Sequence, residues 1–213
     1  MDRNGWRLAA GEVLDAPRFS YRGLMLDVAR NFIPKDVVLR TIDLMSAYKM
    51  NRLHVHLTDD QGWRLEVPDL PELTSVGARR GHDPGSGRRR RSMLSAFLGS
   101  GPSADDRTRN GGSGFYSVKD YRDILRHARW RHVTVVPEVD VPGHAAAAVL
   151  SMRARQLNGG GEGTTFSLVD PDDAREILGF GNYKNNVMNV CTKSSLSFVE
   201  HIISTLIELH KVR

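Results

Sequence analysis

The stretch RLHVHLTDDQGWRLE, residues 52–66, decides the fold because a strand pattern runs directly into a pair of acids. Apolar residues alternate with two histidines over Leu53–Leu57, which predicts a β-strand with one face in a core. Asp59 and Asp60 follow at once, although burying a carboxylate is costly unless it finds partners. A functional site at the end of this strand would explain why the acids are there.

Two other stretches have strand character, and a helical pattern follows each strand of the chain. Ser117 and Asp120 form a capping signal for the helix that leads into the third strand. This alternation predicts the α/β class, with a parallel sheet and crossover helices. The predicted strands are Gly23–Val28, Leu53–Leu57 and Val133–Asp140, and the predicted helices lie at 34–50, 117–132, from about 143, and at 195–211.

Polar and ionisable side chains gather where the three predicted strands end. In parallel α/β folds ligands bind at that edge of the sheet, and in a (β/α)8 barrel it is the catalytic face. Three strands do not close such a barrel. We therefore expect an incomplete (β/α)8 barrel, with the first three β/α units plus the helix that leads to a fourth strand, in the front part of a longer protein. The strand-end residues are Asp27, Arg30, Asp59, Asp60, Glu138, Asp140 and His144.

The net charge of +5 belongs to one segment of the chain. Residues 77–114 contain eight arginines and three aspartates, and the remainder is neutral with 22 basic and 22 acidic residues. This Arg/Gly/Ser-rich composition predicts a flexible, solvated insert, and without interleaved aromatic residues it does not favour nucleic-acid binding. No apolar run is long enough to predict a membrane span, and no signal peptide is visible. The single cysteine, Cys191, excludes an intrachain disulfide, and its apolar neighbours predict a packing role.

Three long motifs resemble glycoside hydrolase family 20, the β-N-acetylhexosaminidases. They are YRGLMLDVARNFIP at 21–34, YKMNRLHVHLTDDQGWRLEVPDLPELTSVGA at 48–78 and GFYSVKDYRDILRHARWRHVTVVPEVDVPGHAAAA at 114–148. FSLVDPDD and NVCTKSSLSFVEHIISTLIELHK look closer to the chitobiase-like branch than to the lysosomal branch. The resemblance covers roughly Asp15 to His210, so we expect a partial catalytic barrel over 15–213 and a residual N-terminal segment over 1–14.

The resemblance implies an activity on oligosaccharides that end in N-acetylglucosamine or N-acetylgalactosamine. In the family the sugar's own 2-acetamido oxygen attacks the anomeric carbon, and the configuration is retained. A glutamic acid protonates the leaving oxygen, and the aspartate before it orients the acetamido group. This sequence contains no Asp-Glu dipeptide, and Glu162 in NGGGEG has no aspartate before it. We therefore expect the chain to be inactive alone. The resemblance implies no cofactor and a lysosomal, periplasmic or secreted location.

Three residues match positions of the family that act at or near the sugar, and two more are expected to work with them. Arg30, in DVARNF, matches the arginine that binds hydroxyls at the far edge of the terminal sugar, a task that suits its fork of donors. Asp59 matches a carboxylate that supports the acid. His144, in DVPGH, matches the active-site histidine, with Asp140 as its expected orienting partner. Glu138 is expected to join this network.

Four further residues near the predicted site have expected roles, and two alternative functions are open. Asp60 is expected to hold the loop and Trp63 to pack beneath it, whereas His54 and His56 share one strand face in core or supporting roles. A metal-dependent hydrolase is one alternative, because HVH followed by aspartates resembles ligand spacing in some barrel enzymes, but the family match requires no metal. A non-catalytic carbohydrate-binding remnant is the other. The sequence leaves the oligomeric state open.

Overall fold

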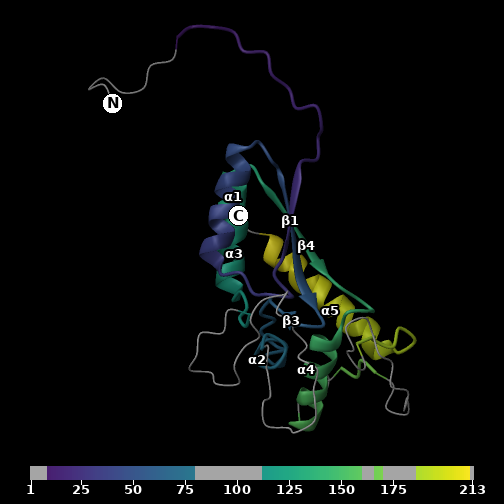
Figure 1. Ribbon diagram of the computed structural model, residues 1–213. Coiled ribbons are helices and arrows are strands. Elements are labelled where there is room, and N and C mark those ends of the chain that lie inside the picture. The colour runs from purple at the N-terminus through teal and green to yellow at the C-terminus, as the bar shows by residue number, and fades with distance from the viewer. Residues whose placement is uncertain (1–8, 80–111, 160–165, 170–185, 212–213) are drawn as a thin grey trace.

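The computed structural model describes residues 9–79, 112–159, 166–169 and 186–211, and a small, largely parallel sheet lies at its centre. Strand β2 (Arg52–Asp59) pairs in parallel with β1 (Gly23–Asp27) on one side and with β4 (Thr134–Val139) on the other (Figure 1). The short β3 (Gly62–Trp63) turns back against the end of β2 in antiparallel pairing. The predicted α/β class with parallel strands is confirmed. The (β/α)8 closure concerns strands that the described residues do not contain, and it stays a prediction.

Helices α1 (Lys35–Ala47), α3 (Val118–Trp130) and α5 (Lys193–His210) pack as neighbours, with α3 in contact with both of the others. The predicted capping box at the start of α3 is present, because Ser117 and Asp120 exchange backbone and side-chain hydrogen bonds. The Tyr121 hydroxyl lies 3.0 Å from His210 Nε2 and joins α3 to α5. The apolar face of β2 and these helices form one core, which includes Leu53, Val55, Leu57, Ile42, Met45, Ile124 and Leu209.

A second core lies below the sheet, where α2 (Glu72–Ser75) and α4 (Ala146–Leu157) meet β3 (Figure 1). Trp63 is 1% exposed there, and its ring lies edge-on to Phe198 with centroids 6.0 Å apart. The predicted packing role of Trp63 is confirmed. Sequence reasoning did not find α2 or β3, because four and two residues are too few to show a periodic pattern.

Arg64 ties the start of the chain's first βα loop to the two ends of the predicted insert. Residues 80–111 of that insert lie outside the described residues, but Gly114 donates to the Ala78 carbonyl at 3.1 Å, so the two ends meet. The Arg64 guanidinium is fully buried between them, and the many carbonyl acceptors compensate its lost hydration. It donates to the backbone oxygens of Val28, Ala29, Ala78, Gly112 and Gly114 at 2.7–3.1 Å.

Two expectations concern the surface of the molecule. Cys191 is exposed, so the predicted packing role is wrong. It lies in the turn just before Thr192, the residue that caps α5, and the helix carries its apolar side chains into the core without it. Of the helices in the described part of the chain, none combines the length and apolar character needed to cross a bilayer.

Candidate functional site

One face of the sheet carries a row of ionisable side chains at the carboxyl ends of three strands. The register pairs Asp27 of β1 with His56 of β2, and His56 with Glu138 of β4. These side chains point away from the apolar face of β2, because successive residues of a strand alternate between faces. The next row along the strands is Met25, His54 and Val136. Met25 is 51% exposed and Val136 37%, so this face is open to solvent.

Arg30 lies in the loop after β1 and is held by two aspartates. Its Nη1 donates to Asp27 Oδ2 at 2.8 Å, and its Nη2 lies 2.7 Å from Asp59 Oδ2. Asp27 Oδ1 also accepts from the Arg30 backbone N–H, which fixes the loop. Burial alone would lower the pKa of Arg30, but hydrogen bonding to Asp27 and the charges of Asp59 and Asp140 outweigh it and raise the pKa. The guanidinium is therefore a permanent cation with a fixed orientation.

His56 bridges two carboxylates from different strands. Its Nε2 lies 2.8 Å from Asp59 Oδ2 and its Nδ1 2.7 Å from Glu138 Oε2, while the side chain is only 5% exposed. Burial favours the neutral ring, but hydrogen bonds to Asp59 and Glu138, with the charge of Asp27, raise the pKa of His56 to about 9. His54 also reaches Glu138 Oε2, at 2.6 Å. Glu138 thus contacts His54 and His56 and not the pair of Asp140 and His144 that it was expected to join, and the supporting role of the two histidines stays a prediction.

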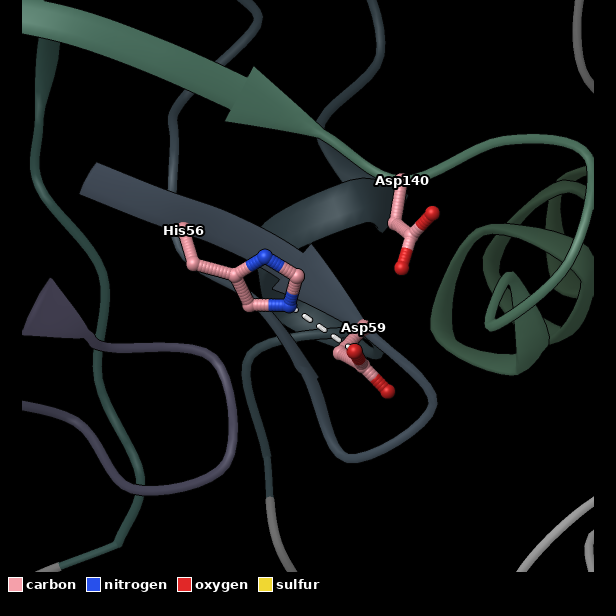
Figure 2. A group of neighbouring side chains, drawn as sticks. All are labelled: His56, Asp59 and Asp140. Atoms are coloured by element: carbon pink, nitrogen blue, oxygen red, sulfur yellow. Dashed lines mark hydrogen bonds and ion pairs between the residues drawn. The ribbon is translucent and has the colours of Figure 1, made fainter. Parts of the chain in front are cut away.

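Asp59 is the centre of the cluster, and its side chain has no exposed surface. Oδ2 faces the two cationic groups of Arg30 and His56, and Figure 2 shows the contact to His56. Oδ1 accepts the backbone N–H of Asp60 at 2.7 Å and lies 3.3 Å from His144 Nδ1. A buried carboxylate is tolerated here because charged donors surround it. Arg30 from the loop after β1, Asp59 from the end of β2 and His144 from the loop after β4 therefore converge on one point.

Asp60 holds the loop that carries His144. Its Oδ1 accepts the Ala146 N–H at the start of α4 at 3.1 Å, and its Oδ2 accepts from the Asn186 amide at 3.0 Å. The expected loop-holding role agrees with these contacts. His144 has a left-handed backbone, φ 50°, and its Nδ1 lies 3.3 Å from one oxygen each of Asp59 and Asp60.

Asp140 is not the hydrogen-bonding partner of His144 that the sequence predicts. Among the described residues no group donates a hydrogen bond to its carboxylate; instead, its backbone N–H donates to Thr58 Oγ1 at 3.0 Å. Figure 2 shows Asp140 just past the end of β4, apart from the contact between His56 and Asp59. Burial and the neighbouring charge of Asp59 raise the pKa of Asp140. Asp140 is thus available to a ligand, and His144 takes its orientation from Asp59 and Asp60.

The cluster also contains atoms that resemble metal ligands. His56, Asp59 and Asp140 form one group with ligand atoms within 4.8 Å of one another, and Asp59, Asp60 and His144 form another. Both nitrogens of His56 already face carboxylates, Nε2 at 2.8 Å from Asp59 and Nδ1 at 2.7 Å from Glu138. Both Asp60 oxygens accept protein hydrogen bonds. Because protein hydrogen bonds and ion pairs already occupy these atoms, the arrangement favours a hydrogen-bonded ion network over a metal centre.

Three supporting residues received no role from the sequence. Asp27 orients Arg30. Its role could have been predicted from its position at a strand end, three residues before that arginine. Arg64 stands as a charged residue between the apolar Trp63 and Leu65, and that contrast is the signal from which its role could have been predicted. Asn186 donates a hydrogen bond to Asp60, although the two residues are 126 positions apart in the sequence, and no local sequence pattern predicts such a contact.

We expect the His56 ring to titrate near pH 9, and the stability of the chain to follow it. Below about pH 6.5 the ring is protonated in both the folded and unfolded states, so the stabilisation is fully present. Between about pH 6.5 and 9 only the folded state keeps the proton, and the free energy of unfolding falls as the pH rises, by on the order of 3 kcal/mol from this group. NMR titration of the His56 ring measures the midpoint.

Two variants sharpen this titration. Glu138→Gln removes one of the two carboxylates and is expected to lower the His56 midpoint by roughly one pH unit. Asp43→Asn, whose carboxylate contacts His127 and Arg131 elsewhere on the surface, should leave it unchanged. A midpoint near 6.5 in the unaltered chain would contradict the bridged arrangement.

Comparison with known proteins points to one family. The sequence model described as glycosyl hydrolase family 20, catalytic domain, matches residues 19–213, and the match covers the N-terminal part of that domain only. The N,N'-diacetylchitobiase of Vibrio harveyi is 48% identical over 205 residues, which are 93% of this chain and 22% of the relative. Beta-hexosaminidase B of Pseudoalteromonas piscicida is 39% identical over 215 residues, 99% of this chain and 27% of the relative.

Solved structures agree with the sequence comparison. The family 20 exo-β-N-acetylglucosaminidase of V. harveyi in complex with N-acetylglucosamine superposes with a TM-score of 0.70 at 35% identity, over 92% of this chain and 26% of that one. A mutant β-hexosaminidase of Streptomyces plicatus, in complex with its product N-acetylglucosamine, gives a TM-score of 0.63 at 30% identity, over 93% of this chain and 32% of that one. The chain thus spans about a quarter of the length of the sequence relatives described above.

Proposed function

Because the chain belongs to glycosyl hydrolase family 20, we propose that it forms the N-terminal part of a β-N-acetylhexosaminidase active site. The substrates are chitooligosaccharides or glycans that end in an N-acetylhexosamine. The observation that carries this proposal is the convergence of Arg30, Asp59 and His144 around one point at the carboxyl ends of parallel strands, with Arg30 2.7 Å and His144 3.3 Å from Asp59. That edge of a parallel sheet is where ligands bind.

Arg30 binds the hydroxyl groups of the terminal sugar. The guanidinium is still 29% exposed on its side chain, although Asp27 and Asp59 hold two of its nitrogens. Its planar fork has five N–H donors, so donors remain for two neighbouring sugar oxygens. Asp27 and Asp59 set its direction before the sugar arrives, which reduces the ordering cost of binding.

Asp59, Asp140 and His144 support the acid side of the reaction. In the proposed mechanism the 2-acetamido oxygen of the sugar attacks the anomeric carbon, a glutamic acid protonates the leaving oxygen, and water then opens the cyclised sugar intermediate with retention. The sequence has no Asp-Glu dipeptide, so the acid and the aspartate that orients the acetamido group come from outside these 213 residues. His144, which is 40% exposed and lies 3.3 Å from Asp59, is the group of this chain to which we assign the support of that acid.

The test is an in-frame chimera. The 213 residues are fused to the segment of V. harveyi chitobiase that follows the region this chain matches. We expect the chimera to hydrolyse a chromogenic N-acetylglucosaminide, and the 213-residue chain alone to release chromophore no faster than buffer. A folded chimera that binds N-acetylglucosamine without turnover would favour the non-catalytic carbohydrate-binding alternative and refute the enzymatic proposal.

A further inference from the structure

The segment from Asn186 to Met188, which we call the support segment, lies against the loop that carries His144. The Ala145 N–H donates to the Asn186 carbonyl at 2.8 Å, and the Met188 N–H donates to the Pro142 carbonyl at 2.8 Å. His144, between these two contacts, has a left-handed backbone with φ 50°, a conformation that a residue other than glycine keeps only when its surroundings hold it. The support segment thus fixes the backbone on both sides of His144.

Burial fixes the support segment itself. Asn186 is 3% exposed and Met188 2%, and Met188 belongs to the second core together with Trp63 and Phe198. Side chains in a close-packed core have little room to shift. Contacts outside the His144 loop therefore anchor the support segment, and it restrains that loop instead of moving with it.

The side chain of Asn186 fixes the carboxylate that faces His144. Its Nδ2 donates to Asp60 Oδ2 at 3.0 Å, and the same oxygen lies 3.3 Å from His144 Nδ1. The other oxygen of Asp60 accepts the Ala146 N–H at the start of α4. With one donor on each oxygen the carboxylate cannot turn, so His144 faces an acceptor in a fixed place.

The Asn186 amide also contains an atom without a partner. Its Oδ1 is buried, and no group among the described residues donates a hydrogen bond to it. A buried acceptor without a donor destabilises the fold, and an apolar side chain of similar size would avoid that loss. The opposite orientation of the amide would bring its oxygen against the Asp60 carboxylate, which is also an acceptor. The amide therefore contributes to the structure through its N–H donor to Asp60.

We propose that Asn186 is a positioning residue for His144, and that it acts through Asp60. The effect on turnover rests on the proposed function, in which His144 supports the acid. Asn186 restricts the His144 ring to one orientation before the sugar binds. Because that support is needed when charge develops in the transition state, loss of the Asn186 donor should lower kcat and leave KM nearly unchanged.

The experiment compares two substitutions in the chimera with the chitobiase segment. Asn186→Leu keeps a similar volume and has no donor, and it is expected to lower kcat by roughly 10-fold at pH 8 with KM changed by less than about 2-fold. Asn186→Asp removes the donor and adds a carboxylate beside Asp60, so it is expected to lower kcat by roughly 10–100-fold at pH 8.

Lowering the pH separates the two variants. Two carboxyl groups in contact share a proton more readily than an isolated carboxyl binds one, and that proton restores a hydrogen bond to Asp60. Asp59 and His144 are also titratable and lie in the same cluster, so each variant is compared with the unaltered chimera at the same pH. We expect Asn186→Asp to recover to within about 3-fold of the chimera at pH 5, whereas Asn186→Leu has no such proton to gain and stays low.

Asn189→Asp is the matched control. It adds the same charge to the same stretch of chain, and its carboxylate can still accept the Cys191 N–H that Asn189 Oδ1 accepts at 2.9 Å. It should leave kcat unchanged at both pH values. Hydrogen exchange at the Ala146 N–H, which Asp60 accepts, is a second measurement that needs no turnover. We expect that exchange to be roughly 10-fold faster in Asn186→Leu than in Asn189→Asp.

An unchanged kcat in Asn186→Leu overturns the inference even if Ala146 exchanges faster, because the contact then holds the loop without serving His144. A rise in KM alone also overturns it, since Asn186 would then act on sugar binding. If the unaltered chimera folds but does not turn over, the proposed function fails and the exchange at Ala146 decides the inference by itself. Faster exchange in Asn186→Leu than in Asn189→Asp then supports the inference, and equal exchange overturns it.

Discussion

Replacing Arg64 with methionine is expected to lower the free energy of unfolding by about 3–5 kcal/mol, a large share of what a domain of this kind has. The methionine keeps the apolar stem but removes a donor from five backbone carbonyls, of which Ala78 and Gly112 keep a backbone N–H donor and the other three lose the donor that Arg64 supplied. A buried carbonyl oxygen that loses its donor destabilises the folded state, because it has given up its hydrogen bonds to water without a replacement. Urea unfolding followed by tryptophan fluorescence should show a midpoint lower by roughly 1–2 M.

A second variant tests the same contact from the other side. A Cβ added at Gly62 would lie 2.3 Å from Cζ of Arg64, so Gly62→Ala must displace the guanidinium. We expect it to destabilise the chain in the same direction. Arg40→Met is the control, because Arg40 is 71% exposed and its ion pair among the described residues is with Asp36 on the same helix. Such surface changes usually stay within about 0.5 kcal/mol. Equal stability of the Arg64 and Arg40 variants would show that Arg64 does not hold these loops.

The Arg64 contacts also connect stability to the candidate site. Val28 and Ala29, whose carbonyls Arg64 binds, stand immediately before Arg30. Two side chains thus fix the backbone of the loop after β1. Arg64 binds its carbonyl oxygens, and the Asp27 carboxylate accepts the backbone N–H groups of Ala29 and Arg30. A loop that loses one of these contacts has more conformations available. Arg30 must then be ordered when the sugar binds, and the entropy lost in that step weakens sugar binding.

The sequence was sufficient to find the three parallel strands because each carries a repeated pattern. Apolar residues at every second position of β2 predict a buried face, and Ser117 with Asp120 predicts the start of α3. The polar residues at the strand ends could be grouped in the same way, since carboxyl ends of parallel strands share one edge of the sheet. Elements of two to four residues, such as β3 and α2, have no period to detect.

The detailed partners within the site could not be obtained from spacing. Asp140 and His144 are four residues apart, which in a helix would bring them together, but α4 begins only at Ala146. The left-handed backbone of His144 turns its ring to Asp59 and Asp60 instead. Likewise, His56 was placed on the correct face, but its bridge between Asp59 and Glu138 depends on the register of three strands, which no single strand pattern contains.

Asp59→Asn is expected to have the largest effect on the site, because it removes the one anion that Arg30 and His56 share. The amide nearly matches the carboxylate in shape, but its NH₂ group cannot accept from two cationic donors. Breaking a buried pair in this way typically costs about 3–5 kcal/mol of stability. The pKa of His56 should also fall from about 9, since a hydrogen-bonded carboxylate is lost. Asp36→Asn on the exposed surface of α1 is the matched control for stability.

In the chimera with the chitobiase segment, the same substitution is expected to lower kcat/KM by roughly 10²–10³-fold, and mainly through kcat. His144 loses the carboxylate that orients it, so the acid is poorly supported when charge develops at the leaving oxygen. Arg30→Lys, in contrast, should act mainly on KM, because a point charge replaces a fork of donors that binds the sugar in the ground state as well. Steady-state kinetics of both variants separate these effects. A chimera whose Asp59→Asn variant keeps the kcat of its parent would show that Asp59 only stabilises the fold.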